Sequence, residues 1–140
     1  MREAFEQTLH EAGASLGTWI VLSALSDEGV VSQTVLGTHI HLDGATITHH
    51  VDRLEKLGLV RRQDDPADRR VHRLELTPAG VRLHRQLLTA VKQLEAQATA
   101  GLNAKQKAEL RRSLDQIRAN LAARRVATGP PPQARTRRTV

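Results

Sequence analysis

The sequence contains no cysteine and almost no aromatic residues, Phe5 and Trp19 being the only two. The absence of cysteine excludes disulfide bonds, thiolate metal sites and cysteine redox sensing. A core with so few aromatics must be built from Leu, Val, Ile and Ala, a composition that favours packed helices. No apolar run approaches the roughly 18 residues of a membrane span, and the N-terminus does not read as a signal peptide. We therefore expect a cytoplasmic protein with no membrane partner.

Positive charge is unevenly distributed along the 140 residues, a length typical of one domain. The formal net charge is +6, yet the segment from Arg124 onward contains five arginines and no acidic residue. Residues 1–123 hold 16 basic and 15 acidic side chains, so that segment is nearly neutral. A nucleic-acid function therefore has to be argued from the positions of the charges and not from their total.

Apolar spacing and capping residues predict six helices. Each helix is expected to begin at a side chain that can accept the first free backbone N–H groups. The expected helices lie at about 2–12, 15–25, 32–40, 43–57, 77–100 and 103–125, and the capping residues are Ser15, Ser32, Asp43, Thr77 and the Asn103–Gln106 pair. The last two helices carry more apolar surface than a small domain needs, which predicts a dimer interface.

A β-hairpin is predicted between the fourth and fifth helices, because LVRRQ and VHRLEL have strand character and DDPAD between them has turn chemistry. Two short helices with a tight link, followed by a hairpin, form a winged helix-turn-helix. The predicted fold class is thus mainly α with a small β-hairpin wing, an α+β arrangement with a helical dimerisation region. We expect one domain over 1–125, with the winged helix-turn-helix at about 15–77, dimerisation helices at about 1–13 and 78–125, and a disordered basic tail over 126–140.

The fourth helix is the candidate DNA-recognition helix, since the second helix of a helix-turn-helix lies in the major groove. Ile47, Val51 and Leu54 form its core-facing stripe. The opposite face then presents Ala45, Thr46, His49, Asp52 and Arg53, with Thr48 on the flank. These side chains suit base edges and phosphates. A solvated amphipathic helix without a DNA role is the alternative for this helix taken alone.

The hairpin strengthens the DNA interpretation, because an arginine at a wing tip can enter the narrow minor groove. Its arginines are Arg61, Arg62, Arg69, Arg70 and Arg73, which could also be a solvated surface. We expect Asp64 and Asp65, with Pro66, to favour the chain reversal. Asp68 lies two residues before Arg70 and is expected to pair with its guanidinium or bond the loop backbone.

From about Gly13 to Leu87 the sequence resembles the MarR family of bacterial transcription regulators. The resemblance rests on LDGATITHHVDRLEKLGLVRR, DDPADRR and LELTPAG. It implies a ligand-responsive repressor that binds double-stranded DNA as a homodimer on a palindromic operator. By position, it places recognition contacts at Ala45, Thr46, Thr48 and His49, wing contacts at Asp68 and Arg70, and phosphate contacts at Ser32 and Gln33. The family usually has glycine where this chain has His41, and alanine at Gly37.

The resemblance also implies a small-molecule effector, often an anionic aromatic, and His10 and Trp19 are candidates to line its site. A tryptophan at such a position is more often a core residue, which is the alternative for Trp19. Seven histidines provide no spacing typical of a metal site, and no cofactor motif is present. No nucleophile motif, phosphate loop or paired carboxylates indicate an enzyme. The alternative to a DNA-binding regulator is a helical dimerisation module whose wing region docks on a protein.

Overall fold

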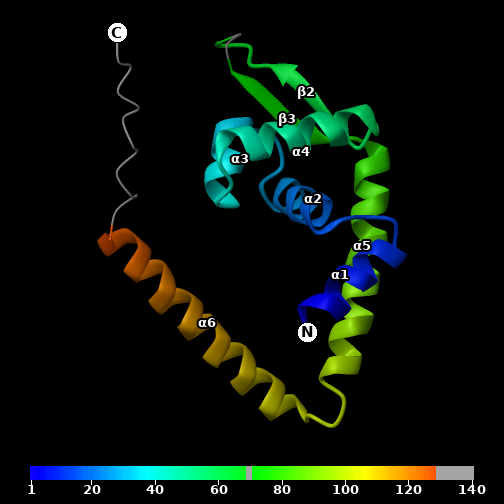
Figure 1. Ribbon diagram of the computed structural model, residues 1–140, viewed down its shortest axis with the longest axis vertical. Coiled ribbons are helices and arrows are strands. Elements are labelled where there is room, and N and C mark those ends of the chain that lie inside the picture. Colours follow the sequence, from blue (N-terminus) through cyan, green and yellow to red (C-terminus); the bar gives the residue numbers. More distant parts are fainter. Residues whose placement is uncertain (69–70, 129–140) are drawn as a thin grey trace, which may run out of the picture. The chain divides into compact units, whose positions relative to one another are not determined.

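The computed structural model describes residues 1–68 and 71–128 (Figure 1). The described residues form six α-helices and three short strands, in the order expected for a winged helix-turn-helix. The elements are α1 (Arg2–Glu11), α2 (Leu16–Glu28), β1 (Val31–Ser32), α3 (Gln33–His39), α4 (Gly44–Lys56), β2 (Val60–Asp64), β3 (His72–Leu76), α5 (Pro78–Ala98) and α6 (Ala104–Thr128). The predicted fold class is confirmed.

The sheet contains one strand that the sequence did not predict. Strand order is β1-β3-β2, all antiparallel, with Val31 opposite Leu74 and Val60 opposite Leu76. The β2–β3 hairpin was predicted from its alternating pattern, but β1 is only two residues long and cannot show alternation. Strand β1 attaches the wing to the start of α3 and so fixes the hairpin relative to the helix-turn-helix.

All of the predicted capping residues are confirmed. The backbone N–H groups of Thr18, Val35, Thr46 and Gly80 donate to the side chains of Ser15, Ser32, Asp43 and Thr77, at 3.2, 3.2, 2.9 and 3.1 Å. Asn103 and Gln106 form the reciprocal capping box, at 2.9 and 3.0 Å. These bonds all join residues three positions apart, which is why the sequence alone identifies them.

The link between α3 and α4 passes through His41 with φ +56°, the single non-glycine residue at positive φ in 1–68 and 71–128. Glycine would adopt this conformation without steric cost, whereas a Cβ atom crowds the backbone. His41 therefore keeps the left-handed backbone conformation that a glycine would adopt in this turn, but with local steric strain.

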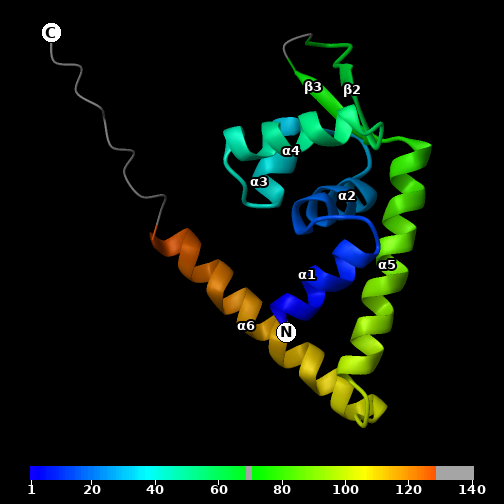
Figure 2. The same cartoon turned by 45° about the vertical axis from the view of Figure 1, so that its right-hand side comes forward.

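The first of two compact units, Met1–Ala98, has a core of aliphatic side chains from every helix and from the sheet. Its fully buried members include Leu9, Leu22, Leu25, Leu36, Val51, Leu54, Val60, Leu74 and Leu87. Both α1 and α2 contact α5, and α2 also contacts α4, so α2 lies in the middle of this unit (Figures 1 and 2). The core thereby fixes the orientation of α4 through its Ile47, Val51 and Leu54 stripe.

The second unit contains α6, whose apolar residues are exposed. Leu110, Leu114, Ile117 and Leu121 have exposures of 45, 52, 53 and 57%. Helix α6 continues to Thr128 and so includes the first three residues of the expected tail. The remainder of that tail, 129–140, lies outside the described residues. None of the helices in the described part is long and apolar enough to span a bilayer.

Candidate nucleic-acid interface

Helix α4 presents the face expected for base reading. Ile47, Val51 and Leu54 are buried, which turns the opposite side of the helix outward. On that side Ala45, Thr48, His49 and Arg53 are exposed and Thr46 is half-buried. Small side chains at the N-terminal end allow the backbone of α4 to approach a groove closely.

The N-terminus of α4 is occupied by the carboxylate of Asp43. Its two oxygens accept from the backbone N–H of Thr46 at 2.9 Å and from the Thr46 hydroxyl at 2.8 Å. These bonds, the backbone one first, hold the pKa of Asp43 below its usual value. The hydroxyl proton of Thr46 is therefore used in the helix cap.

Ser32 and Gln33, the expected phosphate contacts, bind within the protein. The Ser32 hydroxyl caps α3. The amide of Gln33 donates to the Thr48 hydroxyl at 2.8 Å and accepts from Arg62 at 3.2 Å. Gln33 consequently links the helix-turn-helix to the wing.

Arg62 belongs to the hairpin, but it binds carboxylates of α4 and does not face solvent as a free wing arginine would. Its side chain is only 22% exposed and pairs with Asp52 at 2.6 Å and Glu55 at 2.9 Å. Asp52, expected on the outer face of α4, is half-buried by this pairing. Arg62 thus clamps β2 to α4 and is not available to phosphate.

The other described arginines of the hairpin are paired as well. Arg61 pairs with Glu75 across the strands. Arg73 donates to Asp65 at 2.5 Å, and the other oxygen of Asp65 accepts from the Ala67 N–H at 2.8 Å. The Ala67 bond, followed by Arg73, lowers the pKa of Asp65. The expected turn role of Asp65 is confirmed.

Asp68 is exposed at the wing tip, and its carbonyl oxygen accepts from the Val71 N–H at 2.9 Å. The other predicted wing contacts, Arg69 and Arg70, lie outside the described residues. Asp64, the last residue of β2, has a carboxylate oxygen 3.3 Å from the Nδ1 atom of His72.

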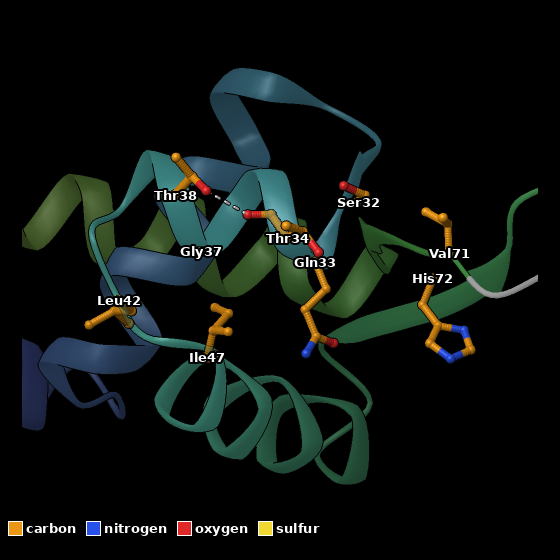
Figure 3. A pocket seen from close by; sticks show the side chains of 10 residues that line it. Ser32, Gln33, Thr34, Gly37, Thr38, Leu42, Ile47, Val71 and His72 are labelled. Atoms are coloured by element: carbon orange, nitrogen blue, oxygen red, sulfur yellow. Dashed lines mark hydrogen bonds between the residues drawn. The ribbon is translucent and has the colours of Figure 1, made fainter. Parts of the chain in front are cut away.

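A shallow cavity of about 350 Å³ is lined by α3, the start of α4 and the end of β3 nearest the wing tip (Figure 3). Ser32, Gln33, Thr38 and His72 supply its polar lining, and Leu42 and Ile47 its apolar floor. In Figure 3 the Gln33 side chain crosses from α3 toward the ribbon of α4.

A larger cavity of about 580 Å³ lies where α1, α2 and α4 meet the start of the wing. His10, Glu6 and Arg53 are its ionisable residues, and Leu16, Leu57, Leu59 and Leu83 its apolar ones. Trp19, the other candidate ligand residue, contacts Phe5 edge-on at 6.3 Å and stacks on His84 at 5.6 Å. Of the two candidates, His10 lines this cavity and Trp19 joins α1 to α5.

Histidines and carboxylates do not converge into a candidate metal site within the described ranges, where no group of three or more is found. His49 and His50 neighbour each other on α4, with ring centroids 6.0 Å apart.

Residues 15–72 match the model of the MarR family. The transcriptional repressor NicR of Pseudomonas putida is 36% identical over 86 residues, which cover 61% of this chain and 54% of NicR. The chain spans about half the length of that relative. The alternative of a protein-docking module is not favoured by these matches.

Two solved structures extend the likeness beyond the winged region. Bordetella bronchiseptica BpsR, whose DNA binding is regulated by 6-hydroxynicotinic acid, is 28% identical with a TM-score of 0.69, covering 81% of this chain and 86% of BpsR. Streptomyces coelicolor PcaV, solved with its natural ligand, is 29% identical with a TM-score of 0.72, covering 89% of this chain and 88% of PcaV.

Proposed function

Because this chain belongs to the MarR family of transcription regulators, we propose that it is a sequence-specific repressor that binds duplex DNA as a homodimer and responds to a small ligand. The observation that carries the proposal is the exposed face of α4 beside a three-stranded wing. In this geometry α4 enters the major groove and the wing follows the neighbouring minor groove.

Base contacts fall to the exposed side chains of α4. Ala45 and the Thr46 methyl meet thymine methyl groups, whereas Thr48 and His49 hydrogen-bond base edges. Arg53, one helical turn beyond His49, contacts phosphate. At the wing, Asp68 holds the tip, and Arg69 and Arg70 reach into the minor groove. Ser32 and Gln33 act on DNA through the α3 cap and through Thr48.

The homodimer is proposed from the exposed stripe on α6. Four large aliphatic side chains, each about half exposed, recur there at spacings of four, three and four residues. A second copy of the same stripe would bury them, as in other isologous helical interfaces. Two recognition helices related by a twofold axis read a palindrome.

The effector is proposed to bind in the cavity of His10, Glu6 and Arg53. Its leucine wall suits an aromatic ring, and the two potential cations suit a carboxylate. Arg53 belongs to α4, so an anion that attracts its guanidinium competes directly with phosphate. An aromatic acid in this cavity would thereby weaken DNA binding; an aromatic acid, 6-hydroxynicotinic acid, regulates the DNA binding of BpsR.

The experiment that tests the function is selection of bound fragments from random duplex DNA, followed by footprinting. A palindrome with half-sites about one helical turn apart, roughly 10 base pairs, is the expected result. Affinity for it should fall steeply with salt, which a protein-docking wing would not produce. Binding without any preferred sequence would contradict the proposal.

The ligand is tested on the selected palindrome with a panel of aromatic acids. Release from DNA is measured for the wild type and for His10→Ala, each relative to its own affinity without ligand. Loss of the imidazole is expected to raise the half-release concentration by about tenfold, the effect of one hydrogen bond to a charged group. Equal half-release concentrations would remove His10 from the site.

A further inference from the structure

The Thr48 hydroxyl makes two hydrogen bonds within the protein. It donates its proton to the carbonyl oxygen of Gly44 at 2.7 Å, one turn earlier in α4. It also accepts a proton from the Gln33 amide at 2.8 Å, across from α3. The side chain nevertheless remains exposed on the face of α4 assigned to DNA.

The orientation of the Gln33 amide follows from its second partner. The other end of the amide lies 3.2 Å from a guanidinium nitrogen of Arg62. A guanidinium can only donate, so the amide oxygen must face Arg62 and the amide nitrogen must face Thr48. Asp52 and Glu55 hold Arg62 in place at 2.6 and 2.9 Å. The Arg62 guanidinium therefore fixes the direction of the Gln33–Thr48 hydrogen bond, in which Gln33 donates and Thr48 accepts.

These contacts leave Thr48 with a defined hydrogen-bonding capacity. A hydroxyl has one proton and two acceptor lone pairs. The proton goes to Gly44 and one lone pair to Gln33, so a single lone pair is left to face solvent or DNA. Thr48 is thus exposed as an acceptor and not as a donor.

We propose that Thr48 is a specificity-determining residue that accepts a hydrogen bond from an exocyclic amino group in the major groove, with Gln33 and Arg62 as positioning residues. Only adenine N6 and cytosine N4 carry such donors at the major-groove edge. Guanine O6 and N7 and thymine O4 are acceptors, which would meet the Thr48 lone pair with repulsion. The inference rests on the proposed DNA-binding function and sharpens it to one kind of base contact.

The test uses the full chain and the palindrome obtained by selection. Each half-site is scanned with bases lacking the amino group, purine for adenine and 2-pyrimidinone for cytosine, and separately with 7-deazapurines, which lack the N7 acceptor. Affinities are measured for the wild type, Thr48→Val and the matched control Thr89→Val. Thr89 makes the same kind of bond to a carbonyl four residues earlier, at 3.0 Å, but on α5.

The wild type and Thr89→Val are expected to lose about 2–10-fold in affinity at one amino-deleted position per half-site, the effect of one neutral hydrogen bond. Thr48→Val should bind normal and amino-deleted DNA equally at that position. Coupling of Thr48 to a 7-deazapurine, or to no position at all, would overturn the proposal. Failure of the proposed function is distinguishable, since no palindrome would then emerge from the selection.

The positioning role of Gln33 is tested with Gln33→Ala, by measuring the ratio of its affinities for normal and amino-deleted DNA. Removal of the amide frees the second lone pair and the rotation of the hydroxyl, so discrimination between normal and amino-deleted DNA should shrink at the same base. A merely structural role would lower affinity for both DNAs and leave their ratio unchanged. An unchanged ratio would remove Gln33 from the arrangement.

Discussion

At the scale of single residues, acidic side chains decide what the wing arginines can do. Arg61, Arg62 and Arg73 each have a carboxylate partner on the same or a neighbouring element. Such pairs in water are individually weak, but they restrict long side chains to one geometry. The described part of the wing is therefore an ordered, nearly neutral surface, and not a diffuse basic patch.

Asp65 provides a test of this ordering role. Asp65→Ala removes both the Ala67 turn bond and the Arg73 pair, so the wing should lose its fixed shape. We expect operator affinity to fall by roughly 3–10-fold, because ordering is then lost on binding. The measurement is fluorescence polarisation with the selected palindrome at fixed salt.

Asp64→Ala is the matched control for charge, since Asp64 directly precedes Asp65 in the chain and is more exposed, with His72 at 3.3 Å as its neighbour. Simple electrostatics predicts that both variants bind DNA more tightly. The ordering model predicts a gain for Asp64→Ala only. Tighter binding by Asp65→Ala would show that the acid acts through its charge alone.

The strained backbone at His41 predicts that one substitution stabilises the fold and another destabilises it. Its φ of +56° suits glycine and penalises branched side chains most. We expect His41→Gly to raise the free energy of unfolding by about 0.5 kcal/mol and His41→Val to lower it by about 1–2 kcal/mol. Urea denaturation of both variants gives the comparison. A stabilised valine variant would contradict the strained turn.

The sequence predicts single residues well where their partners are local. Every side-chain cap of these helices was identified, because the acceptor and donor are only three positions apart. Arg62 was grouped with the other hairpin arginines, and the sequence does not indicate its partners Gln33, Asp52 and Glu55, which come from two other elements. The partners of Gln33 on α4 and β2 were likewise not indicated by the sequence. Long-range side-chain pairing is decided by tertiary packing, which a charge pattern does not encode.

At the scale of elements, two helical glycines have opposite surroundings. A Cβ on Gly37 in α3 would lie 3.4 Å from Ile47 and from the Leu42 carbonyl, an ordinary contact. A Cβ on Gly80 in α5 would lie 2.0 Å from the Leu59 carbonyl oxygen, which is backbone and cannot move aside. Gly80 is therefore required for the close approach of α5 to the start of β2, whereas Gly37 is not required.

The pair of alanine substitutions tests this difference. Gly37→Ala should stabilise the fold by up to about 1 kcal/mol through helix propensity. Gly80→Ala should destabilise it by roughly 1–3 kcal/mol through overpacking. The measurement is the urea midpoint of each variant, compared with that of the wild type under the same conditions. Equal effects of the two substitutions would contradict the packing described for α5.

The α2–α5 contact predicts a pH dependence. His84 on α5 stacks on Trp19 and lies 3.4 Å from the Ser23 hydroxyl. Desolvation lowers the pKa of His84 below 6.5, and the charge of Asp27 only partly opposes this shift. Between the lowered pKa and 6.5 the unfolded chain binds more protons than the folded chain. The free energy of unfolding should therefore fall as the pH decreases through that window.

The measurement is the urea midpoint from pH 7.5 to 5.5 for the wild type and for His84→Gln, which keeps a polar partner for Ser23. The decrease should be smaller in the variant. Fluorescence of Trp19, the single tryptophan, reports the same titration from the stacked ring. A steeper decrease in His84→Gln would reverse the sign assigned to His84.

At the scale of the whole molecule, the sequence predicted the order of elements because amphipathic period, caps and turn residues agree along the chain. Strand β1 escaped prediction because two residues carry no periodicity. The apolar stripe of α6 was predicted from the sequence, and in the single chain its side chains are about half exposed to solvent. Apolar patches of this kind on one copy indicate an interface.

Leu114 is the residue through which dimerisation can be tested. Its side chain is 52% exposed in the middle of the α6 stripe, so Leu114→Glu would place a charge at the centre of the proposed interface. We expect the variant to sediment as a monomer. It should also lose roughly 100-fold in affinity for the palindrome, because two linked half-sites become two independent ones.

Ala119→Glu is the matched control, since it adds the same charge to the opposite, exposed side of α6. It should remain dimeric and retain most of its affinity for the palindrome. Sedimentation velocity on both variants at one protein concentration separates the effect of position from that of charge. If Leu114→Glu sedimented like Ala119→Glu, the stripe would not be the dimer interface. The palindrome would then have to be read by a contact elsewhere in the chain.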